Sequence, residues 1–185
     1  MNALINLHDD AVDLLEHRVA PWLLPTLARI VFAAVFFVYF WNSATLKLDG
    51  LFTPTAGAFG QIFPKSAEAV LWDVSQATIF QKTVMVLGGW AEFVLPILLL
   101  VGFATRLAAL GMIGFVLVQS LVDVTGHGVA LGAWFDNDAL SAIMDQRTLW
   151  VFLLAYMVFR GAGPISVDAA IRRLRGEALT PQSAD

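Results

Sequence analysis

The sequence predicts an all-α integral membrane protein, a four-helix bundle with amphipathic surface helices at both termini. Hydrophobic residues make up 58% of its 185 residues and charged residues 14%, and the mean hydropathy is +0.74. A water-soluble fold of this length cannot bury so much apolar surface. The apolar residues gather in four long stretches, 22–46, 82–101, 104–124 and 147–162. The first three reach the roughly 20 residues that a hydrocarbon core about 30 Å thick requires.

Residues 1–20 form the first predicted unit, an amphipathic helix over 3–19 that is expected to lie on the membrane surface, with Pro21 and Pro25 separating it from the first span. Its apolar side chains recur at helical spacing, opposite acidic residues. The apolar positions are Leu4, Leu7, Ala11, Leu14 and Leu15. Acidic residues occupy the region where a secretory signal carries positive charge, and no small-residue cleavage site follows. We therefore expect the first span to remain as a membrane anchor.

Residues 21–163 are predicted to hold the four spans. The connection 48–81 is apolar and interrupted by glycine and proline, which predicts short helices packed on the mouth of the bundle or dipping into the membrane interface, rather than a solvated linker. In the second span, Gly88 and Gly89 allow a neighbouring helix to approach closely. The tight turn 102–106 predicts that the second and third spans are antiparallel neighbours.

Residues 164–185 are the last predicted unit, a second surface helix and a tail, with Ser166 placed to cap the helix. The apolar stripe of this helix is Val167, Ala170, Ile171 and Leu174. Lysine and arginine are more frequent in the flanks on the side of the termini than on the opposite side. This bias predicts a multi-pass protein with both termini in the cytoplasm.

Composition excludes several kinds of chemistry. The chain has no cysteine, which excludes disulfides, thiol redox chemistry, iron–sulfur ligation and c-type haem attachment. Of its three histidines, His8 and His17 precede the first span, so a bis-histidine haem within the bundle is not expected. The net charge of −4 gives no basic stripe for nucleic acid. No nucleotide-binding, zinc-protease or nucleophile-elbow motif is found, so catalytic residues remain unknown, and a redox role would need a partner's cofactor or a bound lipid-soluble carrier.

Two charged residues lie well inside the predicted spans, away from the span ends: Arg29 in the first and Glu92 in the second. The helical rise places them roughly 10 Å and roughly 13 Å from the cytoplasmic ends of their spans. A charge near the bilayer centre costs about 2.5–3.5 kcal/mol, so we expect the two to pair. The simplest interpretation is a salt bridge that fixes helix register. The functional alternative is that Glu92 holds or relays a proton, or that the pair hydrogen-bonds a quinone head group.

A second polar group is expected at the outer mouth of the bundle. Lys47 follows Arg29 by about five helical turns, and the third span presents two polar residues one turn apart. The expected cluster is Asn42, Lys47, Gln119, Asp123, His127, Asp145 and Arg147. Solvated interfacial charge is the simplest interpretation, and a polar pocket for an anion or a quinone head group is the alternative. No metal is expected, because one imidazole and carboxylates without thiols make a poor copper or zinc site.

The order and spacing of four segments resemble the DoxX family of small four-span bacterial membrane proteins, over roughly residues 22–171. The segments are an arginine early in the first span with a polar outer end (Arg29 and 41–47), a glutamate among apolar residues (90–93, then 99–102), the opening of the third span (105–109) and the close of the bundle (161–168). Ile165 stands where the family pattern usually has a basic residue.

The resemblance implies a bacterial inner-membrane protein in redox or metal stress. The expected function is an auxiliary or quinone-proximal subunit of a redox or stress-response membrane system, with no intrinsic cofactor and a bound quinone as the open possibility. If the protein is an enzyme, it acts within a quinone-linked oxidoreductase complex. The alternatives are a small transporter or proton or ion path, and a membrane partner of a metal-handling peptide. Expected partners are the lipid bilayer and a redox or metal-handling protein, and a homo-oligomer is also left open.

Overall fold

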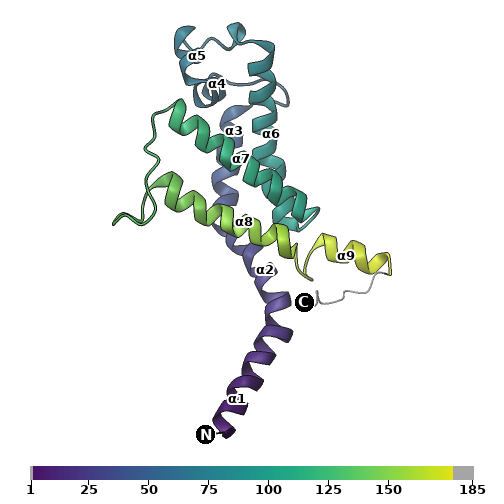
Figure 1. Cartoon of the computed structure of the whole chain (residues 1–185). Helices are drawn as coiled ribbons and strands as arrows, with labels where there is room; N and C mark the ends of the chain where they lie inside the picture. Colours follow the sequence, from purple (N-terminus) through teal and green to yellow (C-terminus); the bar gives the residue numbers. More distant parts are fainter. Residues whose placement is uncertain (1, 177–185) are drawn as a thin grey trace.

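A computed structural model describes residues 2–176 of the chain (Figure 1). Helices account for all the regular secondary structure of this part, and no strand is formed in it. In chain order the elements are α1 (Asn2–Asp13), η1 (Leu14–Val19), α2 (Ala20–Phe32), η2 (Ala33–Phe37), α3 (Val38–Lys47), α4 (Ala56–Ile62), α5 (Pro64–Ala69), η3 (Val74–Gln76), α6 (Ile79–Val101), α7 (Thr105–Thr125), η4 (Ala142–Arg147), α8 (Thr148–Arg160) and α9 (Val167–Leu174).

Within residues 2–176, four continuous helices are long and apolar enough to cross a membrane: Leu4–Lys47, Ile79–Val101, Thr105–Thr125 and Ala142–Arg160. The first joins α1, η1, α2, η2 and α3, and the last joins η4 and α8. The predicted all-α bundle with four spans is therefore confirmed. Many of the large apolar side chains on these helices are exposed, as expected of a surface that meets lipid rather than water.

The N-terminal helix differs from the prediction because Pro21 and Pro25 do not separate it from the first span. The π-helical turn η1 precedes Pro21, and the N–H of Ala20 bonds to the carbonyl of Leu15, five residues back. Such widened turns rearrange the backbone hydrogen bonds that a proline would otherwise interrupt. In Figure 1, α1 continues the line of α2 away from the bundle. Its described side chains are exposed, and its position on a membrane surface stays a prediction.

The main core lies between α2, α6, α7 and α8. Its largest fully buried side chains are Phe32, Phe40, Leu99, Met112, Val116, Leu154 and Met157. A second, smaller cluster sits under the outer connection, where α4 and α5 cover the beginning of α6 (Figure 1). This arrangement confirms the short helices predicted at the mouth of the bundle.

The turn between α6 and α7 confirms that these two spans are antiparallel neighbours. Gly102 ends α6 with φ +70°, a left-handed conformation that favours glycine. A Cβ at this position would lie 2.6 Å from the Cβ of Ser166 and 2.8 Å from the Cζ of Arg29. Gly102 therefore lets the α8–α9 connection and a buried arginine close on the end of α6.

The C-terminal helix begins as predicted, since the Ser166 hydroxyl accepts a hydrogen bond of 3.1 Å from the N–H of Ala169. One side of the short helix α9 is anchored by the buried Ala169, while Leu174 is exposed. The predicted C-terminal unit extends to residue 185, and residues 177–185 lie outside the described part. The membrane-surface position of α9 stays a prediction.

Candidate functional site

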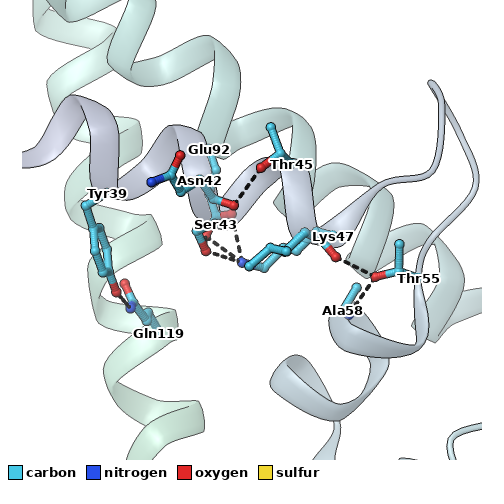
Figure 2. Close-up of polar contacts among 10 residues, drawn as sticks. Tyr39, Asn42, Ser43, Thr45, Lys47, Thr55, Ala58, Glu92 and Gln119 are labelled. Atoms are coloured by element: carbon cyan, nitrogen blue, oxygen red, sulfur yellow. Dashed lines mark hydrogen bonds and ion pairs between the residues drawn. The ribbon is translucent and has the colours of Figure 1, made fainter.

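The outer half of the bundle contains a buried ion pair between Lys47, the last residue of α3, and Glu92 in α6. The Lys47 ammonium lies 2.7 Å and 2.8 Å from the two carboxylate oxygens of Glu92. The Ser43 hydroxyl, one turn before Lys47, accepts from the ammonium at 2.7 Å and donates to Glu92 at 3.2 Å. Figure 2 shows the lysine side chain reaching back along its own helix to meet the carboxylate. Both charged residues are only 3% exposed.

The predicted pair of Arg29 and Glu92 is wrong, although both residues are buried as expected. Arg29 donates instead to the carbonyls of Leu99 and Leu100, at 3.0 Å and 2.5 Å. These residues follow Glu92 by about two helical turns, or roughly 10 Å. The carbonyls of the last helical turn have no partner within the helix, and the guanidinium offers five donors. The end of α6 therefore holds Arg29, which leaves Glu92 to a lysine from the outer side.

Arg29 also ties the α8–α9 connection to the bundle by donating to the carbonyls of Ala162 and Ile165, at 3.0 Å and 2.5 Å. Near it, the Asp168 carboxylate accepts from the N–H groups of Ala104 and Thr105 at the start of α7. A cation at a helix C-terminus and an anion at a helix N-terminus both interact favourably with the helix dipole. This inner group, defined as Arg29 and Asp168 with their backbone partners, holds helix ends together. The contacts of the guanidinium are all with backbone carbonyls, so its role in the structure is to join these segments.

The expected outer cluster divides into separate contacts. Asp123 forms an ion pair with Arg147, whose guanidinium also donates to the Ser120 hydroxyl at 2.9 Å. The Gln119 amide donates to the Tyr39 hydroxyl at 3.0 Å. Two ion pairs therefore stand on neighbouring helices of the outer half, one on α6 and one on α7.

The remaining predicted residues do not join this group. The His127 ring contacts the backbone carbonyl of Gln61 at 2.9 Å. Asp145 accepts from the N–H of Ser141 and forms a local helix-start turn. Asn42 is exposed. The prediction that all seven side chains converge is wrong for these three, because His127 meets a carbonyl of α4, Asp145 bonds to backbone at the start of η4, and Asn42 is exposed.

A cavity of about 370 Å³ lies between α6 and α7, and four of the predicted residues belong to its lining. These four are Lys47, Glu92, Gln119 and Asp123. The lining is otherwise mostly apolar and includes Leu87, Leu95, Phe115 and Val118. The cavity thus combines a mostly apolar wall with a few polar groups, the usual composition of a small-molecule site.

Glycines keep this cavity open. A Cβ added at Gly114 would meet nothing within 4 Å, and one at Gly88 would only touch Ile62 at 3.6 Å. Gly89, by contrast, is where α6 and the end of α3 come close, since a Cβ there would lie 2.7 Å from the Leu48 side chain. The predicted close approach is therefore confirmed at Gly89, whereas Gly88 and Gly114 border empty space.

Sequence reasoning missed Tyr39, Ser120 and the full role of Ser43. Ser43 stands one helical turn before Lys47, and that spacing predicts a contact between them. Ser120 follows Gln119 directly and carries no comparable signal. Its contact with Arg147 depends on how α7 packs against η4 and α8, which no local pattern in the sequence specifies.

Comparison with known proteins agrees with this architecture. The DoxX family model matches residues 24–124. No curated protein and no solved structure was found to match the chain. The matched range covers more than half of the chain and includes Lys47, Glu92, Gln119 and Asp123 of the cavity lining. The protein therefore belongs to the DoxX family and is a multi-pass membrane protein.

Proposed function

We propose that this protein binds a lipid-soluble quinone in the cavity between α6 and α7, as an auxiliary or quinone-proximal subunit of a redox or stress-response system. The proposed location is the bacterial inner membrane, with both termini in the cytoplasm. The single observation that carries the proposal is the composition of the cavity. Its apolar wall suits an isoprenoid tail and its few polar groups suit a ring with hydrogen-bonding oxygens.

The placement of the cavity supports a ligand that arrives from the bilayer. Its wall includes Leu87 and Val118, which are 62% and 58% exposed on the outside of the bundle. A molecule dissolved in lipid could pass along this side of α6 and α7 without crossing the main core. A water-soluble ligand would instead have to reach the site past the outer helices α4 and α5.

Two ion pairs, the buried pair of Lys47 with Glu92 and the partly buried pair of Arg147 with Asp123, explain how polar groups are kept beside an apolar wall. An isolated charge in such surroundings is costly, and a partner charge with further hydrogen bonds offsets much of the cost. The two pairs leave the polar part of the lining with no net charge. Neutral quinone head groups fit this balance better than anions do. Since the chain contains no cysteine, we propose that electrons reach or leave the quinone through a partner's cofactor.

The test is to purify the protein in nanodiscs and to quantify extracted quinones per protein by mass spectrometry. We expect Gly114→Leu to lower bound quinone by roughly tenfold, because a side chain filling the groove costs at least about 1–2 kcal/mol of binding. Leu117→Phe is the matched control, since Leu117 is 59% exposed on the same helix and does not line the cavity. Protein that carries no quinone and takes up none when it is supplied would contradict the proposal.

A transport path through the bundle has less support. On the cytoplasmic side of Glu92, the space between the helices is filled by buried apolar side chains that include Leu99, Met112 and Met157. A proton or ion path would need polar groups or water along this segment. Proteoliposome flux that is lost in Glu92→Gln would favour transport over quinone binding.

A further inference from the structure

The hydrogen-bond donors of Lys47 and Ser43 are already committed. The three hydrogens of the Lys47 ammonium match its three contacts, with the Ser43 hydroxyl and the two oxygens of Glu92. The Ser43 hydroxyl donates its own hydrogen to Glu92. A lysine ammonium has only three donors and a hydroxyl only one. This ion pair therefore has no donor left for a ligand.

Acceptors, by contrast, are left over. Gln119 has a buried side-chain oxygen with no hydrogen-bond partner. Asp123 receives Arg147 on one carboxylate oxygen, and its other oxygen has no hydrogen bond from any described residue. Glu92 receives a single hydrogen bond on Oε2, and a carboxylate oxygen can accept two. Three acceptor groups of the cavity lining thus retain unused capacity.

The carboxylates carry this argument independently of the amide. Rotation of the Gln119 amide would exchange its oxygen and nitrogen, and the Tyr39 hydroxyl can serve either arrangement. The oxygens of Asp123 and Glu92 accept in both cases. A ligand that fills the cavity takes these oxygens out of contact with other donors, so a ligand that donates gains more here than one that only accepts.

We infer that the cavity binds the reduced, dihydroxy form of its quinone more tightly than the oxidised form, an inference that rests on the proposed function. A quinone ring offers only carbonyl acceptors, whereas a hydroquinone offers two O–H donors. Both forms are neutral and suit the two closed ion pairs equally. Donor count is therefore the feature that separates them at this site.

The experiment compares three probes that carry the same short isoprenoid tail: a benzoquinone, its hydroquinone, and the dimethyl ether of that hydroquinone. Binding to the full-length protein in nanodiscs is measured without oxygen, by quenching of tryptophan fluorescence. We expect the hydroquinone to bind about tenfold more tightly than the other two, since one satisfied buried acceptor is worth about that factor. The same preference raises the midpoint potential of the bound two-electron couple by about 30 mV.

Two variants locate the preference. Gln119→Leu removes one acceptor and is expected to reduce the preference several-fold. Gln146→Leu is the matched control, because Gln146 is an exposed glutamine that does not line this cavity. If the benzoquinone binds as tightly as the hydroquinone or more tightly, the inference is overturned while quinone binding stands. If none of the three probes binds, the proposed function itself fails.

Discussion

The inner end and the middle of α6 show two ways of keeping a charge inside a membrane bundle. At the inner end, the guanidinium of Arg29 is surrounded by backbone carbonyls from two parts of the chain. At the outer half, Glu92 meets the ammonium of Lys47, and the pair lines a cavity. The inner charge is satisfied by helix ends and joins structural elements. The outer charges satisfy each other and leave room beside them for another molecule.

The comparison predicts different outcomes when each charge is removed. The largest expected effect is that of Lys47→Met, which leaves Glu92 buried without a counter-charge. We expect a loss of about 3–5 kcal/mol in the free energy of unfolding, measured by titration with a denaturing detergent. The double variant Lys47→Met with Glu92→Met should recover most of this loss, because no lone charge remains. A double variant as unstable as the single one would show that the pair does not act as a unit.

Removing the charge of Arg29 should lower the free energy of unfolding somewhat less than Lys47→Met does. No second substitution should restore the loss. Arg29→Met leaves backbone carbonyls at the end of α6 and in the α8–α9 connection without donors, for which we expect a loss of about 3 kcal/mol. No single substitution deletes carbonyl groups, so no rescue is expected. Arg106→Met is the control at the same end, since Arg106 is exposed, and should change stability by about 0.5 kcal/mol or less. Equal effects of the two variants would refute the structural role of Arg29.

The smallest expected effect concerns the hydroxyl that bridges the outer pair. Ser43→Ala removes one acceptor from Lys47 and one donor from Glu92 but leaves the ion pair in place. We expect a loss of about 1 kcal/mol in the same unfolding measurement. Thr45→Ala, two residues along α3, is the control, because the Thr45 hydroxyl bonds only to a carbonyl of its own helix. A Ser43 variant as damaging as Lys47→Met would mean that the hydroxyl, and not the charge, holds Glu92.

Much of this fold could be predicted from the sequence because the determinants are local. Span lengths follow from apolar runs, and the sharp α6–α7 turn follows from the short segment that contains Gly102. The burial of Arg29 and Glu92 also followed from their positions within those runs. The partners of these two residues could not be predicted in the same way. Backbone carbonyls belong to every residue, so the sequence cannot show that a helix end will attract Arg29 in preference to a carboxylate.

The error over Glu92 has a second cause, the length of a lysine side chain. Lys47 is the last residue of its helix and was expected among solvated charges at the outer mouth. Its four methylenes let the ammonium enter the bundle while the backbone stays at the mouth. The cavity beside it could not be predicted, because an unfilled volume depends on how α6 and α7 pack around Gly88 and Gly114.

The unbroken first helix has a consequence for the N-terminus. Its 44 residues correspond to a length of about 66 Å, roughly twice the thickness of a hydrocarbon core. The part of the helix that exceeds this thickness is the acidic, amphipathic N-terminal segment. If the helix stays straight, this segment extends out of the bilayer along the direction of the span. To lie flat on the lipid it must bend relative to the span, and η1, with its irregular backbone hydrogen bonding, lies between the two.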